Sequence, residues 1–322
     1  MDRRRLTGIV LILASAAGFG SGSLFAQPVY GAGVDWLVLS AWRFLLGAGL
    51  TWGWLLLSAD RRRGLRSLGR RTVVVTVALG VLYVGNSGAY YAGLETVSPS
   101  LAALIVFVYP ALVAVLSLRF GRRLEGRRAW FALAVALVGV GLSLGGIDPA
   151  DAPPLSGLLL VIASPIIYSI WIVLAARLSG EREDSVGDQA GDGASVAAAT
   201  ALMMSTTAGV YWAAALLGDR PVLPMEIPSA AWFGIVGVGV MSTFVAIQTF
   251  YAGAQRIGAA QAALISTVEP VWTIVLAAIL FSVALTPIQL VGGALILGGV
   301  LIAQTGPASE RARRPVIRVA DE

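Results

Sequence analysis

The chain contains no cysteine, no histidine and no lysine. Without cysteine and histidine it has no disulfide framework, no Cys/His zinc site, no haem ligand of either type and no nucleophile that depends on a histidine base. Without lysine it lacks the phosphate-binding lysine of a Walker A loop, which argues against ATP-driven pumping by this chain alone. These absences predict a protein with no metal and no cofactor, and they argue against an enzyme.

Charge is also scarce. Of the 322 residues, 57% are hydrophobic and 13% are charged, and the mean hydropathy is +0.82. So few polar side chains cannot cover a soluble globule of this size. At roughly 20 apolar residues for each crossing, the length leaves room for about ten spans and no sizeable soluble domain. The sequence therefore predicts an all-α integral membrane protein whose main contact is the lipid bilayer.

Ten apolar stretches are long enough to cross a bilayer. The first follows Arg3, Arg4 and Arg5, as the apolar region of a signal peptide would. Its apolar region is too long for that assignment and further spans follow, which favours an uncleaved first helix. The predicted spans are 6–26, 36–58, 72–94, 98–118, 129–147, 154–178, 195–217, 229–254, 257–282 and 286–304.

The arginines are concentrated on one side of this topology. With ten spans, the amino terminus, the loops after even-numbered spans and the carboxyl-terminal tail hold 21 of the 23 arginines. The opposite loops carry only Arg220, among several acidic residues. By the positive-inside rule both termini are cytoplasmic. This placement predicts a multi-pass protein of the cell membrane, and it favours lipid over nucleic acid as the partner of the basic segments.

One segment of the chain is repeated. Tyr91–Pro110 recurs without a gap 160 positions later as Tyr251–Pro270, with nine identities where roughly two are expected by chance in so apolar a composition. Gly8–Ala26 aligns in the same way on Gly157–Ala175. Five spans in each unit force the two units into opposite orientations, so the repeat is inverted. The predicted divisions are a first five-helix repeat over 1–147, a second over 148–304 and a basic cytoplasmic tail over 305–322.

Two charged side chains lie inside predicted spans. Glu269, in the ninth, costs several kcal/mol unless it is paired, hydrated or protonated, so it should face the interior of the bundle or a cavity. It is a candidate ligand for a substrate amine or a proton-coupling group, and the alternative is a packed or interfacial acid. Arg43, in the second span, is a candidate for binding a substrate carboxylate or pairing with Glu269, although a structural role bonded to helix-end carbonyls is favoured.

Other candidates are polar or aromatic side chains that share a helix face. Such a face would line a substrate path with hydrogen-bond donors and aromatic walls, whereas the alternative is interhelical hydrogen bonding, worth under about 1 kcal/mol per pair. The candidates are Tyr83, Asn86 and Tyr90 in the third span, Gln248 and Tyr251 in the eighth, and Trp272 in the ninth.

Pro110 and Pro270 occupy matched positions in the fourth and ninth predicted spans. Each removes one backbone hydrogen bond and frees the carbonyl four residues earlier. Such interruptions are tolerated where protein or a cavity satisfies the freed groups, so the two prolines are symmetric hinge candidates. Passive helix kinks are the other interpretation.

Several of these segments resemble a known family. The run Ala-Trp-Arg-Phe-Leu-Leu-Gly at 41–47, the repeated segment that ends at Pro110, and Glu269-Pro270 are similar to EamA-type transporters of the drug/metabolite transporter superfamily. The resemblance implies ten helices in two inverted units, a central substrate cavity and alternating access. The chain departs from the common Gly-Glu-Arg-Leu after the fourth and ninth helices, where it has Gly-Arg-Arg-Leu at 121–124 and Phe-Ser-Val-Ala at 281–284.

The sequence thus predicts a secondary transporter or facilitator that exports small metabolites by alternating access. Amino acids and amphipathic compounds are the candidate substrates, and a homodimer is one option for assembly. A different class is an intramembrane enzyme or carrier that acts on lipid-linked headgroups, and a receptor or scaffold that moves no solute is a third. The missing histidine and cysteine and the lack of clustered carboxylates for a metal argue against the enzyme.

Overall fold

The structure is a computed structural model of the full chain. It describes residues 3–57, 59–66, 68–93, 96–97, 102, 105–120, 124, 126–144, 154–178, 193–281 and 287–304. Within these residues all regular structure is helical, as predicted, and no strand occurs. The helices are α1 (Arg3–Gly31), α2 (Trp36–Leu56), α3 (Ala59–Arg66), α4 (Arg70–Gly93), α6 (Tyr109–Phe120), α7 (Gly126–Leu144), α8 (Leu155–Leu178), α9 (Gly193–Leu217), α10 (Ala231–Gly237), the π-helix η2 (Val238–Val245), α11 (Ala246–Ile257), α12 (Ala259–Ser266), α13 (Glu269–Phe281) and α14 (Pro287–Gln304).

Among the residues that the structure describes, five helical segments have both the length and the apolar composition needed to cross a membrane. Two shorter apolar helices, Tyr109–Phe120 and Leu290–Ile302, accompany them. This result supports a multi-pass membrane protein, whereas the count of ten spans stays a prediction. The five segments are Arg3–Gly31, Arg70–Gly93, Leu155–Ala176, Ala197–Leu217 and Ala231–Ile257.

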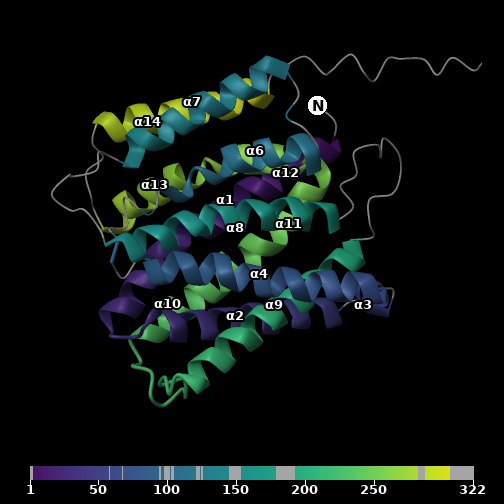
Figure 1. The fold of residues 1–322 in the computed structure, drawn as a ribbon, viewed down its shortest axis with the longest axis vertical. Helices are drawn as coiled ribbons and strands as arrows, with labels where there is room; N and C mark the ends of the chain where they lie inside the picture. Colours follow the sequence, from purple (N-terminus) through teal and green to yellow (C-terminus); the bar gives the residue numbers. More distant parts are fainter. Residues whose placement is uncertain are drawn as a thin grey trace, which may run out of the picture.

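The helices lie side by side in an elongated bundle (Figure 1). α7 and α14 pack together at one end of the long axis, and α2 packs on α9 at the other. Between these pairs, α4 packs on α8, and α1 packs on η2 and α11. Each of these pairings joins a helix from the first half of the chain to one from the second half.

Glycine allows the closest of these approaches. In α7, a methyl group added at Gly139 would lie 2.6 Å from the carbonyl oxygen of Gly292 and 2.8 Å from the amide nitrogen of Ile296, both in α14. Only a residue without a Cβ fits against a neighbouring backbone at this separation. The apolar, glycine-rich sequence therefore produces tight helix pairs in the absence of a hydrophobic driving force between helices in lipid.

The predicted ninth span, 257–282, is not a single helix but two, α12 and α13. α11 ends at Ile257, Gly258 has a φ of 89°, and a turn at 267–268 separates α12 from α13. A turn at 107–108 precedes α6 in the same way, 160 positions earlier. In both places a helix begins one residue before Pro110 or Pro270, because proline lacks the N–H that would extend a preceding helix but fits the first turn of a new one.

The predicted eighth span, 229–254, is also irregular. Its middle is the π-helix η2, between α10 and α11. The backbone of α1 lies close to η2 here: Ser242 Oγ donates a 2.7 Å hydrogen bond to the carbonyl oxygen of Gly18. Thr243 Oγ1 donates to the carbonyl oxygen of Val238 five residues earlier, at 3.1 Å. Such π-segments are rare and widen the helix locally, which no periodicity in the sequence announced.

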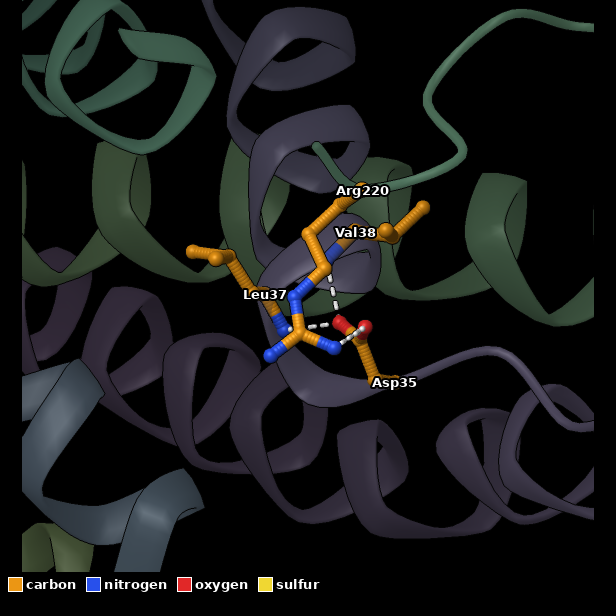
Figure 2. Close-up of polar contacts among 4 residues, drawn as sticks. All are labelled: Asp35, Leu37, Val38 and Arg220. Carbon is orange, nitrogen blue, oxygen red and sulfur yellow. Dashed lines mark hydrogen bonds and ion pairs between the residues drawn. The ribbon is translucent and has the colours of Figure 1, made fainter. Parts of the chain in front are cut away.

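Different charged residues lie at the two faces of the bundle that the helix termini form. At one end α3 carries a run of arginines beside the ends of α2 and α9, and Arg128 Nε donates to the carbonyl oxygen of Ile302 at 2.9 Å. At the other end Asp35 caps α2 by accepting from the amides of Leu37 and Val38, at 2.8 and 2.9 Å (Figure 2). The guanidinium of Arg220 lies 3.4 Å from the same carboxylate.

Candidate functional site

A cluster of aromatic side chains lies where α4, α6 and α8 meet. The ring centroids of Tyr83 and Trp171 are 4.8 Å apart, and those of Tyr109 and Tyr168 are 5.0 Å apart. Tyr168 stacks on Trp171 with centroids 5.7 Å apart. Trp171 is fully buried, Tyr83 and Tyr109 nearly so, and these four residues form a continuous aromatic wall inside the bundle.

The wall extends to helices of both halves of the chain. On one side Phe44 of α2 contacts Tyr83 edge-on at 5.7 Å and stacks on Tyr211 of α9 at 5.5 Å. On the other side Phe250 and Tyr251 of α11 lie 6.2 and 5.6 Å from the ring of Trp171. We use the name aromatic cluster for the following residues around this point: Phe44, Tyr83, Phe107, Tyr109, Tyr168, Trp171, Tyr211, Phe250 and Tyr251.

Arg43 joins α2 to α4 at the edge of this cluster. It is 6% exposed and donates to the hydroxyl of Tyr91 at 2.8 Å and to that of Ser87 at 3.1 Å. Its guanidinium carbon also lies 4.5 Å from the centroid of the Phe44 ring and 5.0 Å from that of Tyr91. The pairing with Glu269 that the sequence left open is therefore replaced by hydroxyl and ring contacts.

Those contacts account for a charge buried in the membrane. Placing an arginine at the centre of a span costs roughly 2.5–3.5 kcal/mol. Each hydrogen bond to a charged group contributes about 1.5–3 kcal/mol, and each cation–π contact adds about 0.5–2 kcal/mol. Two of each offset this cost, although the buried Nε of Arg43 has no hydrogen-bond partner among the described residues. The partners are hydroxyls and aromatic rings, not the helix-end carbonyls expected from the sequence.

Glu269 is placed differently. It is the first residue of α13, where Thr273 Oγ1 donates to its carbonyl oxygen at 3.1 Å. Within the described part of the chain, its carboxylate has no hydrogen bond or ion pair. The helix N-terminus stabilises an anion by about 0.3–1 kcal/mol, which is less than the several kcal/mol that a buried carboxylate costs in a membrane. The remainder must come from a proton, from water or from a bound cation.

The third-span candidates share one side of α4. Tyr83 belongs to the aromatic cluster, and one turn later the amide oxygen of Asn86 accepts a 2.9 Å hydrogen bond from the hydroxyl of Ser164 in α8. Tyr90, another turn on, is half-buried and contacts Tyr91 edge-on at 5.3 Å. These three lie on the face that α4 turns toward α8 and the aromatic cluster.

The remaining candidates are spread more widely. The hydroxyl of Tyr251 donates to the sulfur of Met203 at 3.1 Å, beside the aromatic cluster. Gln248 instead points toward α2, where its amide donates to Thr51 Oγ1 at 3.1 Å. Trp272 is 41% exposed, and its indole nitrogen donates to Ser21 Oγ of α1 at 2.9 Å. Pro110 and Pro270 are buried just after the helix breaks.

The sequence reasoning missed most of the aromatic cluster. Tyr168 and Trp171 are three residues apart on α8 and therefore share a face, which is a signal that spacing alone provides. The position of Tyr109 opposite Glu269 in the repeat was visible, but not its burial against Tyr168. Trp171 also has a buried indole nitrogen with no hydrogen-bond acceptor among the described residues.

The comparisons with known proteins decide the family. A model of the EamA-like transporter family matches residues 6–145 and 155–305. The chain belongs to the EamA-like transporter family. The resemblance inferred from the residues is confirmed, and with it a membrane transporter rather than an enzyme is indicated.

Relatives of this EamA-like transporter carry the same general description. The chain is 27% identical over 248 residues to an uncharacterized transporter of Archaeoglobus fulgidus, covering 74% of this chain and 79% of that protein. It is 24% identical to the uncharacterized transporter YcbK of Bacillus subtilis, covering 94% and 93% of the two chains. A protein of known crystal structure superposes with a TM-score of 0.70 at 20% identity, covering 94% of this chain and 98% of that one, which supports the fold alone.

Proposed function

We propose that this EamA-like transporter carries a small metabolite out of the cell by alternating access between two inverted five-helix repeats, 1–147 and 148–304. In this proposal the chain crosses the cell membrane ten times. Both termini and the tail 305–322 lie in the cytoplasm, as the arginine-rich end of the bundle favours.

The pairing of the helices supports the two repeats. In the aligned repeats α1 corresponds to α8, α4 to the segment that ends with α11, and α6 to α13. The contact of α4 with α8 in one half therefore corresponds to the contact of α11 with α1 in the other. The contact of α6 with α8 likewise corresponds to that of α13 with α1. The pairs α2 with α9 and α7 with α14 each join corresponding helices. A bundle of two related units that rock against each other would have this pattern.

The single observation that carries the proposal is the matched pair of helix breaks beside the aromatic cluster. The turns at 107–108 and 267–268 are followed by Tyr109 and Glu269, each the first residue of a new helix. Interrupted helices with a polar residue at a half-helix end are the usual construction of a binding site at the membrane midplane. Pro110 and Pro270 then act as hinges that let each half-helix move as its side of the site opens.

Of the two charged residues inside the predicted spans, the half-buried Glu269 is the better candidate for contact with the substrate. Its carboxylate lacks the compensation that Tyr91, Ser87 and Phe44 give to Arg43. A substrate with an amine, such as an amino acid or another amphipathic cation, would supply the missing charge. Tyr83, Asn86 and Tyr90 would line the path on α4, with Tyr251 opposite them on α11.

Counterflow in liposomes tests this function. Purified full-length protein, loaded with an unlabelled solute, should accumulate the labelled solute from outside when that solute is a substrate. We expect accumulation for at least one amino acid or amphipathic amine in a panel of amino acids, purines and cationic compounds. Accumulation of none of them would contradict the proposed substrate class.

A matched pair of variants tests the site. Glu269→Gln removes the carboxylate from the half-buried site and should lower counterflow at least tenfold. Glu226→Gln makes the same change on an exposed loop, where Glu226 accepts from the amide of Leu223, and should leave counterflow unchanged. Equal activity of the two variants would exclude Glu269 from substrate contact.

A further inference from the structure

An apolar groove opens on the outer surface of the bundle, between α2 and α9. Its volume is about 380 Å³. A methyl group added at Gly49 or Gly209 would meet no atom within 4 Å, so no other element of the described chain fills the space. The lining residues are Leu45, Ala48, Gly49 and Trp52 of α2 and Ser205, Ala208, Gly209 and Trp212 of α9.

The polar atoms of the groove are already bonded within the protein. The indole nitrogen of Trp52 donates to Ser205 Oγ at 2.8 Å, and Ser205 Oγ donates to the carbonyl oxygen of Ala201 at 2.8 Å. The indole nitrogen of Trp212 donates to the carbonyl oxygen of Ala41 at 3.0 Å. A ligand of the groove therefore needs no hydrogen-bonding group, and a hydrocarbon chain suits it.

A basic helix lies at one end of this groove. α3 follows α2 after a short turn, packs on α9 (Figure 1), and contains four arginines and one aspartate. Leu65 of α3 packs in the same small cluster as Trp52 and Leu55 of α2. The groove and α3 are thus continuous parts of one surface.

Two of the arginines are held at the level of the last turn of α2. The guanidinium of Arg61 lies 4.2 Å from the centroid of the Trp54 ring and donates to the carbonyl oxygen of Trp54. Arg62 is exposed and donates to the carbonyl oxygen of Leu56 at 2.6 Å. Each guanidinium carries five N–H donors and spends one on these carbonyls, so donors remain for a phosphate.

The dimensions match those of one lipid leaflet. The lining of the groove on α2 runs from Leu45 to Trp52, and the last turn of α2 continues the same face to Leu56. Leu45 and Leu56 are eleven residues apart, which at 1.5 Å per residue is about 16 Å. Half of a hydrocarbon core of roughly 30 Å is about 15 Å. A lipid with its headgroup beside α3 would therefore extend one acyl chain along the groove to about the middle of the membrane.

We propose that the groove between α2 and α9, together with α3, is a binding site for one anionic phospholipid, with the phosphate on Arg62 and an acyl chain against Gly49 and Gly209. Arg61, held on Trp54 at the other side of α2, adds to the positive potential of this end of the groove. The charge of α3 selects an anionic headgroup. A second copy of this chain is disfavoured as the occupant, because a symmetric contact would bring two positively charged α3 helices together. The site is independent of the solute that the protein transports.

Quenching of tryptophan fluorescence by brominated lipids tests the proposal, since Trp52 and Trp212 line the groove. The full-length protein is placed in phosphatidylcholine vesicles that contain increasing fractions of brominated phosphatidylglycerol or brominated phosphatidylcholine. We expect the anionic lipid to bind about fivefold more tightly, the factor that corresponds to about 1 kcal/mol for an arginine near the membrane surface. In the double variant Arg61→Gln/Arg62→Gln, the ratio of the affinity for the anionic lipid to that for phosphatidylcholine should be close to one.

Matched controls separate a site from general surface charge. Arg3→Gln/Arg4→Gln removes two exposed arginines elsewhere and should keep the fivefold ratio. Arg61→Lys/Arg62→Lys keeps the charge and should keep most of the preference, which guards against a fold defect in the glutamine variant.

The groove itself is tested by filling it. Gly49→Leu should abolish the tight quenching phase, while Gly141→Leu, at another glycine where an added methyl meets no atom within 4 Å, should not. The proposal is overturned if the ratio survives Arg61→Gln/Arg62→Gln, if it falls equally in Arg3→Gln/Arg4→Gln, or if Gly49→Leu leaves quenching unchanged. Dissociation of a dimer by Gly49→Leu would overturn it as well, in favour of a second copy in the groove.

Discussion

Gly80 is the position at which a single methyl group tests the packing around the candidate site. It lies on α4, one turn before Tyr83, against α9. An added Cβ would lie 2.7 Å from the carbonyl oxygen of Met203 and 2.8 Å from Cβ of Thr206. Both are held by the backbone of α9, so neither can move aside alone. Gly80→Ala therefore has to push α4 away from α9, and Tyr83 moves with it.

Gly85 provides the matched control on the same helix. Its nearest outside atom to an added Cβ would be the terminal methyl of Ile167, at 3.7 Å, an ordinary contact. Alanine favours a helix over glycine by about 0.8–1 kcal/mol at either position, so this gain cancels between the two variants. What remains is overpacking at Gly80, typically about 1–3 kcal/mol.

The free energy of unfolding measured by titration with SDS in mixed micelles should thus be about 1–3 kcal/mol lower for Gly80→Ala than for Gly85→Ala. Counterflow by Gly80→Ala should fall as well, because Tyr83 is displaced from Trp171. A difference in stability below about 0.5 kcal/mol would refute the close packing of α4 on α9.

Two further predictions concern the ends of the bundle. Asp35→Ala removes the cap of α2 and should lower the free energy of unfolding by about 1 kcal/mol, whereas Arg220→Gln should cost less than about 0.5 kcal/mol because its ion pair is solvent-exposed. Equal losses would assign the stabilisation to the ion pair instead of the cap. For topology, a reporter fused after Gln304 should be active only in the cytoplasm and one inserted within 148–153 only outside; the reverse pattern would contradict the proposed orientation.

Composition and the length of the apolar stretches predicted the helical membrane fold, because apolar length is a strong signal in the bilayer, where every backbone group must be satisfied within the segment. The family followed from the residues at 41–47 and from the repeat that ends at Pro110 and Pro270. These features are local in sequence. They could be interpreted without knowing which helices touch.

The interior of the site depended on contacts that no local pattern encodes. Proline marked the irregular places, but not that the helix would stop at 267–268 and restart at Glu269. The partners of Arg43 are 44 and 48 residues away, on another helix, and the hydroxyl of Tyr251 donates to the sulfur of Met203 on α9. Tyr168 was overlooked although its spacing to Trp171 puts both on one face of α8, because an aromatic pair in an apolar span is as often a packing pair as a functional one.

The central claim is that one site opens in turn to each side of the membrane, and the absence of native cysteine allows a direct test. A single cysteine at Tyr90, on the face of α4 that also carries Tyr83 of the aromatic cluster, can be labelled with a membrane-impermeant thiol reagent in sealed vesicles of either orientation. Cysteines at Gly69 and Met225, exposed at opposite ends of the bundle, report one side each. Alternating access predicts that Tyr90→Cys reacts from both sides and is protected by substrate. Reaction from one side only, in a variant that still transports, would contradict it.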